Sequence, residues 1–157
     1  MMAGQSFLKR DDTIGAVILA EASTWIGTPY RHQGSRKGVG CDCLGLVRGV
    51  WRAVYGSEPE SPSAYGADWW VRGDDERLLE AAMRHCRRKD RGHAGVVLAP
   101  GDLVLFRFRP GRPASHLAIA VGKDRFIHAY EQAGVIASPL VEAWRARIAA
   151  VFQFPER

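Results

Sequence analysis

Apolar positions near the start of the chain recur every three or four residues. Between residues 13 and 25 this spacing predicts an amphipathic helix, which Asp11 or Asp12 can cap and Gly27 can end. The glycine- and proline-containing segment 28–40 that follows is expected to be a loop.

The same spacing returns twice before the middle of the chain. A second helix is expected to open at residue 42 or 43, to run to about residue 55 and to close at Gly56. Segment 57–73 is expected to be irregular. A third helix is expected over residues 74–88, because acidic residues gather at its start and basic residues at its end, as the helix dipole favours.

Beyond residue 92 the pattern changes to short β-like runs separated by turn residues. Strands are expected at residues 103–108, 116–121, 125–130, 134–138 and 148–154. Helices first and strands afterwards predict an α+β domain, in which the N-terminal helices pack on a mostly antiparallel sheet.

Composition and charge limit the number of domains and the kinds of partner that this chain can have. The 157 residues suit a single domain, 1–157, and 46% hydrophobic residues are ordinary for a globular chain. A net charge of +5 favours anionic surroundings such as nucleic acid, anionic lipid or the bacterial wall. The densest basic run, 84–91, has no interleaved aromatic residues, so we interpret it as a solvated helix end and expect no nucleic-acid partner.

The sequence predicts neither a signal peptide nor a membrane span. Residues 1–10 lack an apolar core behind a basic segment, and no run approaches the roughly 18 apolar residues of a spanning helix. We therefore expect the protein to be made in the cytoplasm, so that action at a cell wall requires delivery by a partner. Three cysteines (Cys41, Cys43, Cys86) suit neither a disulfide framework nor a zinc site, and no metal or cofactor is expected.

Cys43 is the candidate nucleophile. Asp42 is a good N-cap residue, which places Cys43 in the first turn of the second helix. There the unpaired backbone N–H groups and the dipole are expected to lower the pKa of the thiol and to receive the oxyanion formed when sulfur attacks a carbonyl. The alternative is a buried, inert cysteine. Cys41, in the loop before the cap, is interpreted as an incidental or structural thiol.

A thiol peptidase also needs an imidazole base and a group that orients it. His116 and His128 lie on consecutive expected strands. A three-residue loop, 122–124, pairs Ala118 with His128 and puts both imidazoles on one face, whereas a two-residue loop, 123–124, separates them unless a bulge intervenes. We predict the odd loop or a bulge, with His116 as general base and His128 holding it by a hydrogen bond. The alternative for each histidine is an ordinary strand residue.

These motifs occur together in the order of a known family. They are Trp25-Ile26-Gly27-Thr28-Pro29-Tyr30, Asp42-Cys43-Leu44-Gly45-Leu46-Val47, Pro100-Gly101-Asp102-Leu103-Val104, His116-Leu117-Ala118-Ile119-Ala120-Val121-Gly122 and Phe126-Ile127-His128-Ala129. Over most of residues 13–154 the sequence resembles the NlpC-type cell-wall cysteine peptidases. Segments 27–33 and 42–51 are similar to members encoded in phage tail and gene-transfer-agent clusters.

The resemblance implies a papain-like fold and hydrolysis of the γ-D-glutamyl–diaminopimelate bond in peptidoglycan stem peptides. It implies Cys43, His116 and His128 as the catalytic triad. It also implies that the Tyr30 hydroxyl helps to line the oxyanion site, and we group Asp42 with it in the oxyanion and substrate-binding region. The alternative for Tyr30 is a packed loop aromatic.

The resemblance also has departures and leaves other functions open. Leu44 stands where many members have serine after the nucleophile, and segment 57–92 is long, which suggests a lid, a specificity element or a docking surface. Trp69 and Trp70 there are candidates to grip a ligand. Phage-like tail proteins are candidate partners. The remaining alternatives are an amidase that cleaves the muramoyl–alanine bond and a non-enzymatic tail protein that keeps the fold as a scaffold.

Overall fold

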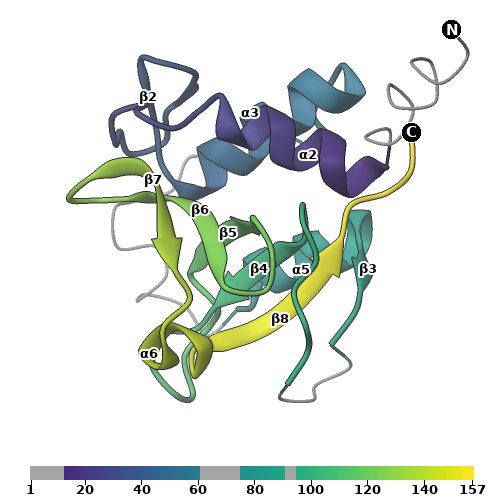
Figure 1. Cartoon of the computed structure of the whole chain (residues 1–157), viewed down its shortest axis with the longest axis vertical. Coiled ribbons are helices and arrows are strands. Elements are labelled where there is room, and N and C mark those ends of the chain that lie inside the picture. The colour runs from purple at the N-terminus through teal and green to yellow at the C-terminus, as the bar shows by residue number, and fades with distance from the viewer. Residues whose placement is uncertain (1–12, 61–74, 91–94) are drawn as a thin grey trace, which may run out of the picture.

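Two N-terminal helices lie side by side against one face of a sheet (Figure 1). The computed structural model describes residues 13–60, 75–90 and 95–157. Helix α2 spans Ile14–Ser23 and helix α3 spans Cys43–Tyr55. Thr13 caps α2, because its hydroxyl oxygen accepts a hydrogen bond from the Ala16 N–H. The prediction of an aspartate cap was wrong, and Asp11 and Asp12 lie outside the described residues.

The sheet contains all five predicted strands, with ends that agree within two residues, and one strand that was not predicted. Its order is β3-β8-β4-β5-β6-β7, and every neighbouring pair is antiparallel. The strands are β3 (Arg87–Arg88), β4 (Leu103–Phe106), β5 (His116–Ala120), β6 (Arg125–Tyr130), β7 (Gly134–Pro139) and β8 (Ile148–Gln153). The α+β prediction is confirmed.

The hairpin between β5 and β6 has the register that brings two histidines to one face. Ile119 lies opposite Ile127, and the Val121 N–H donates to the Arg125 carbonyl at 2.9 Å. The loop is therefore the three-residue segment 122–124. Because side chains alternate along a strand, the positions of His116 and His128 share a face, as predicted.

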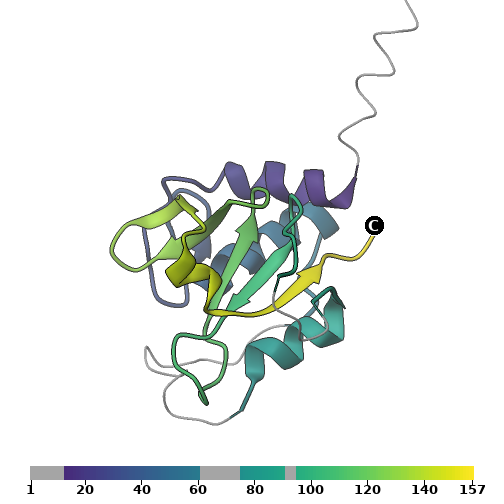
Figure 2. The same cartoon turned by 60° about the horizontal axis from the view of Figure 1, so that its bottom comes forward.

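The third helix, α5 (Arg77–His85), is shorter than expected. It lies near the β3 and β8 edge of the sheet, away from α2 (Figure 2). The prediction that it continues to residue 88 was wrong, because Arg87 and Arg88 pair with β8 and thereby satisfy backbone groups that a solvated helix end leaves to water. The basic run is not a solvated helix end either: the Lys89 ammonium lies 2.6 Å from the Asp102 carboxylate.

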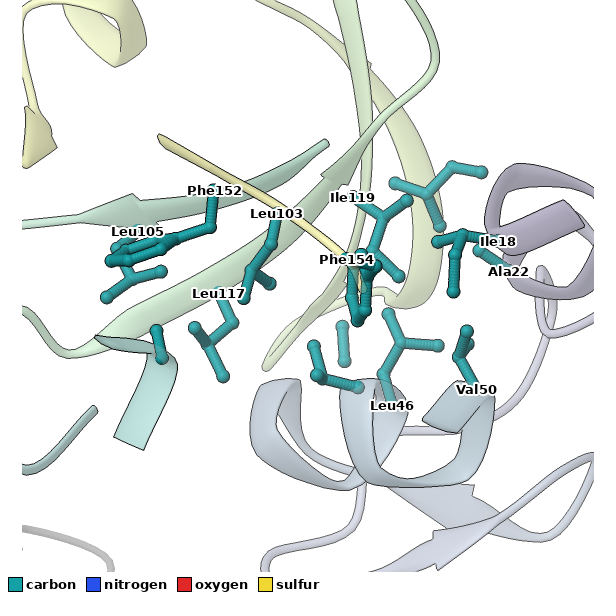
Figure 3. Close-up of a cluster of buried hydrophobic side chains, with 14 of the residues drawn as sticks. Ile18, Ala22, Leu46, Val50, Leu103, Leu105, Leu117, Ile119, Phe152 and Phe154 are labelled. Carbon is teal, nitrogen blue, oxygen red and sulfur yellow. The ribbon is translucent and has the colours of Figure 1, made fainter. Parts of the chain in front are cut away.

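Side chains bury the sheet on both faces. The larger core lies between the sheet and helices α2 and α3, as Figure 3 shows for Ile18, Leu46 and Ile119. On the other face, Phe106, Phe126 and neighbouring residues form a second cluster against which Trp144 packs. Trp144 belongs to the short helix α6 (Glu142–Arg145). The sheet therefore separates a helical layer from an aromatic layer.

The two remaining short strands, β1 (Ser35–Arg36) and β2 (Gly40–Cys41), pair within the expected loop before α3. Part of the expected insertion, including Trp69 and Trp70, lies outside the described residues. Among the helices of the described ranges, none combines the length and the apolar character needed to cross a membrane.

Candidate active site

The start of α3 is fixed by the side chain of Asp42. This residue is buried, and one carboxylate oxygen accepts the Gly45 N–H at 2.8 Å, which confirms it as the N-cap. The other oxygen accepts the Gln33 N–H at 2.8 Å and so ties the preceding loop to the helix. A carboxylate does not stabilise an oxyanion. We therefore assign Asp42 a positioning role here, and substrate binding by it stays a prediction.

The first turn of α3 also lies close to the backbone of the preceding loop. A Cβ added at Gly45 would meet the Gly34 carbonyl oxygen at 1.7 Å, so only glycine permits this approach. The Ser35 hydroxyl donates to the Gly45 carbonyl at 2.6 Å, and the Arg52 guanidinium donates to the Ser35 hydroxyl at 2.9 Å. The nucleophile is thus held by both its helix and its loop.

The Cys43 sulfur lies against the backbone at the start of β5. It is 4.0 Å from the Ser115 carbonyl oxygen, and the Leu117 N–H is close enough to favour the thiolate. The backbone on both sides of His116 therefore lies at the sulfur. Residue Cys43 as a whole is partly exposed, while its sulfur packs against this backbone.

The two imidazoles form a hydrogen-bonded pair. His116 Nε2 lies 2.8 Å from His128 Nδ1, and both side chains are buried, with His128 only 1% exposed. This confirms the predicted contact between the two rings. With Nε2 of His116 engaged in this way, its Nδ1 is the nitrogen left to accept a proton.

A third residue extends this hydrogen-bonded series. His128 Nε2 lies 2.8 Å from the hydroxyl of Ser138, which stands on β7. In the arrangement that leaves His116 Nδ1 as the acceptor, His116 Nε2–H donates to His128 Nδ1 and His128 Nε2–H donates to Ser138. Sequence reasoning did not find this residue, because a serine within a strand carries no motif of its own.

Aromatic side chains surround the imidazole pair on the outer face of the sheet. The Trp144 ring centroid lies 5.8 Å from that of His116 and 5.4 Å from that of His128. Phe108 lies 5.6 Å from His116, and Tyr130 lies 5.5 Å from His128. Sequence reasoning did not find Trp144 as part of the site, because its four-residue helix is too short to show a periodic pattern.

Burial decides the protonation state of the resting site. It raises the pKa of the Cys43 thiol to about 12, with the Asp42 charge adding to the rise, although nearby backbone N–H groups oppose it. The backbone N–H groups of Cys43 and Leu44 at the helix terminus do lower this pKa, as predicted, but burial outweighs them, so the expected net decrease was wrong. Burial also lowers the pKa of His116 to about 3, with a further contribution from His128, and that of His128 to about 4. The site rests as a neutral thiol beside neutral imidazoles.

Tyr30 lies next to the nucleophile. Its backbone forms a bridge with Cys41, two residues before Cys43. Burial, followed by the charges of Cys43, Asp42 and Glu131, raises the pKa of its phenol to about 12, so the hydroxyl remains a hydrogen-bond donor. The structure brings Tyr30 to the sulfur, while its contact with an oxyanion stays a prediction.

The other two thiols lack these partners. Cys41 is fully buried in the main core, and burial raises its pKa to about 12. Cys86 borders an apolar cleft of about 460 Å³ between α3 and α5, and burial raises its pKa to about 12 as well. Among the described residues, neither makes the contact with the backbone at the start of β5 that the Cys43 sulfur makes, so Cys43 remains the candidate nucleophile.

Ser115 differs from its polar neighbours at the site. Its hydroxyl is buried and makes no hydrogen bond with the residues that the structure describes. Most buried polar groups in proteins are paired, so such a hydroxyl beside a nucleophile is a candidate to bond a substrate.

Comparison with known proteins relates this sequence to one family. The sequence model of the NlpC/P60 family matches residues 27–152. The chain is 30% identical over 141 residues to the murein DD-endopeptidase MepS/murein LD-carboxypeptidase of Escherichia coli, covering 89% of this chain and 63% of that protein. It is 28% identical over 143 residues to the γ-DL-glutamyl hydrolase of Bacillus subtilis, covering 90% of this chain and 30% of that protein.

A solved structure supports the fold in the same way. The NlpC/p60 domain of the peptidoglycan hydrolase SagA superposes with a TM-score of 0.58 at 26% identity, covering 89% of this chain and 98% of that domain. The helices on an antiparallel sheet are therefore those of a known catalytic domain. The chain spans about two thirds or less of the two curated relatives named above, at 63% and 30% of their lengths.

Proposed function

This chain belongs to the NlpC/P60 family, and we propose that it is a cysteine endopeptidase that cuts peptidoglycan stem peptides at the γ-D-glutamyl–diaminopimelate bond. The observation that carries the proposal is the 2.8 Å contact between His116 Nε2 and His128 Nδ1, on a strand whose backbone lies at the Cys43 sulfur. It supplies a nucleophile, a base and a group that orients the base.

The reaction follows the order of these contacts. Cys43 Sγ attacks the carbonyl carbon of the scissile amide as its proton passes to Nδ1 of His116. The carbonyl oxygen becomes an oxyanion, which the Cys43 backbone N–H and the Tyr30 hydroxyl stabilise. His116 then gives its proton to the leaving nitrogen, the C–N bond breaks, and a thioester forms on Cys43. Water, losing a proton to His116, hydrolyses the thioester and restores the thiol.

The cost of the imidazole pair argues against a scaffold that merely keeps the fold. Burying two polar rings among phenylalanine and tryptophan side chains costs desolvation free energy, and the hydrogen bond between the rings offsets only part of that cost. Apolar residues of similar volume would pack here at least as well. A chemical role explains why the ring nitrogens are present.

The bond that is cleaved can be identified by digesting muropeptides and analysing the products by mass. A new free amine on diaminopimelate supports the proposed bond, and a new carboxylate on the γ-glutamyl half accompanies it. Release of the peptide from muramic acid would identify an amidase, and cleavage of a cross-link would identify an activity like that in the name of MepS. No product with the native protein would contradict the proposal.

Cys43→Ala and Cys41→Ala form the matched pair for this digestion. Both remove one sulfur, but the Cys43 sulfur lies against the backbone at the start of β5, whereas Cys41 is fully buried in the main core. Cleavage should vanish in the first variant and persist in the second. Full activity in Cys43→Ala would show that another group carries out the chemistry.

We also propose that a phage-like tail carries the protein from the cytoplasm to the wall. Support comes from the similarity of segments 27–33 and 42–51 to members encoded in tail and gene-transfer-agent clusters. Antibody labelling of purified particles tests this, because a delivered hydrolase copurifies with tails. Its absence from particles that otherwise assemble normally would refute this route.

A further inference from the structure

Glu76 is the residue immediately before α5, and its side chain contacts the segments around the catalytic strand. Among the described residues it makes no hydrogen bond that caps its own helix. One carboxylate oxygen accepts the Ala114 N–H at 2.8 Å, and the other accepts a hydrogen bond from the Arg107 guanidinium at 2.6 Å. The side chain is partly buried, with 29% of its surface exposed. The reaction steps given above assign this carboxylate no role.

The contact with Ala114 fixes the backbone that leads to the sulfur. Ala114 is buried in the main core and precedes Ser115, whose carbonyl oxygen lies 4.0 Å from the Cys43 sulfur. The next residue, His116, begins β5. A buried backbone N–H requires a hydrogen-bond partner, and Glu76 supplies the partner of the Ala114 N–H. Glu76 therefore holds the chain two residues before the candidate base.

The contact with Arg107 connects the same carboxylate to the strand beside His116. Arg107 directly follows β4 and lies between Phe106 and Phe108 in the sequence. The rings of these two phenylalanines lie 6.0 and 5.6 Å from the His116 ring. Phe106 is also the residue opposite His116 in the register of β4 and β5. The Glu76 carboxylate thus joins the end of β4 to the start of β5, where the imidazole stands.

We propose that Glu76 is a positioning residue, which holds the start of β5 and thereby the orientation of the His116 ring. This inference rests on the proposed function, because that imidazole is the base of the proposed reaction. The alternative is a local role, in which a carboxylate at a helix N-terminus stabilises α5 through the helix dipole. A local role changes only the free energy of unfolding, whereas positioning changes kcat in the folded protein, since a misplacement of about 1 Å can cost about a hundredfold in rate.

The test compares three variants by steady-state cleavage of a muropeptide. Glu76→Ala removes both contacts, whereas Glu76→Gln keeps an amide oxygen that can accept the Ala114 N–H. Glu60→Ala is the matched control, because it removes a carboxylate that pairs with Arg84 and His85 at the other end of α5. Glu76→Ala should lower kcat about tenfold or more and leave KM within about twofold. Glu76→Gln should recover most of kcat, and Glu60→Ala should stay within about twofold of the native kcat.

The imidazole nitrogens give a second readout that does not depend on cleavage. Their signals in proton–nitrogen NMR spectra report the hydrogen bond between His116 Nε2 and His128 Nδ1. These signals should shift in Glu76→Ala and stay in place in Glu60→Ala. If the native protein cleaves no muropeptide, the proposed function fails, while a shift confined to Glu76→Ala still supports the positioning role.

The inference is overturned if folded Glu76→Ala keeps kcat within about twofold of the native value, or if its imidazole signals do not move. An equal loss of kcat in Glu60→Ala would also overturn it, because stability of α5 would then explain the effect. Equal losses in Glu76→Ala and Glu76→Gln would contradict it as well, since the amide still satisfies the Ala114 N–H. If Glu76→Ala does not fold, Glu76→Asp replaces it: this side chain is one methylene too short to keep both contacts, so unshifted imidazole signals would refute the proposal.

Discussion

Replacing His128 tests whether the imidazole pair orients the base or merely fills space. His128→Leu keeps a similar volume and removes both hydrogen bonds of the ring, to His116 Nε2 and to Ser138 Oγ. His128→Asn is the matched variant, because its amide oxygen can still accept a hydrogen bond from His116 Nε2–H. The comparison therefore changes the hydrogen bond more than the packing.

The expected loss of activity in His128→Leu follows from the burial of His116. Leaving its N–H unpaired in a site that is only 7% exposed costs about 1–3 kcal/mol. If the ring turns to escape this penalty, Nδ1 leaves the position from which it receives the thiol proton in the proposed reaction. The same free energy appears as a loss of about 5- to 150-fold in kcat for His128→Leu, with less change in KM. His128→Asn should recover most of the rate.

The assay is steady-state cleavage of a muropeptide, with urea unfolding as the control for stability. A rate within twofold of the native value in a folded His128→Leu protein would refute the orienting role. Equal losses in the leucine and asparagine variants would show that the ring itself, rather than its acceptor, is required.

Three further changes test other contacts of the site. Ser138→Ala should lower kcat by less than His128→Leu and leave KM nearly constant, since it removes only the hydrogen bond between Ser138 and His128. A larger loss of kcat than in His128→Leu would contradict this prediction. Ser115→Ala should raise the free energy of unfolding by up to about 1 kcal/mol in urea titrations, because it removes a buried hydroxyl that has no hydrogen-bond partner among the described residues. A destabilised variant would refute that reasoning. Between about pH 6.5 and 4, the unfolded chain binds protons at both histidines, whereas the folded protein, with lowered histidine pKa values, does not, so the free energy of unfolding should fall as pH falls. In His128→Asn the slope of the free energy of unfolding against pH should decrease by up to about 1.4 kcal/mol per pH unit. An unchanged slope would refute the assignment.

Long, regular patterns in the sequence predicted the main elements, whereas short or tertiary features were not visible. Helix α3 shows a full apolar stripe between an aspartate cap and a glycine with φ of 89°, so its bounds were predictable. For β5 and β6, the requirement that both imidazoles share a face predicted an odd loop or a bulge, and the structure has the odd loop. In contrast, the two-residue strand β3 and the four-residue helix α6 are too short to show a period. Strand β3 forms by pairing with β8, which is distant in sequence. Helix α6 is held by packing of Trp144 against the aromatic layer.

The candidate triad was predictable for the same local reasons, but the contacts around it were not. Cys43 follows an aspartate cap, and the two histidines occupy positions of matching parity on a hairpin. Ser138 and Trp144 reach the same rings from β7 and α6. Only packing brings these segments together, because no spacing along the chain relates them to the motif.

The magnitude of burial explains why the thiol needs a base as well as a helix terminus. A rise of the Cys43 pKa from 9 to about 12 corresponds to about 4 kcal/mol against the thiolate. A helix terminus typically returns 0.3–1 kcal/mol, and about 2 kcal/mol in favourable partly buried geometry. The dipole alone therefore leaves the sulfur protonated. Because burial also lowers the pKa of His116, transfer of the thiol proton to this imidazole is itself unfavourable in the resting site. The remaining free energy must therefore come from interactions of the bound substrate with the charges that develop during the attack. It follows that neither the helix terminus nor the imidazole alone activates Cys43, and that stabilisation of the developing charges by the bound substrate is required for attack.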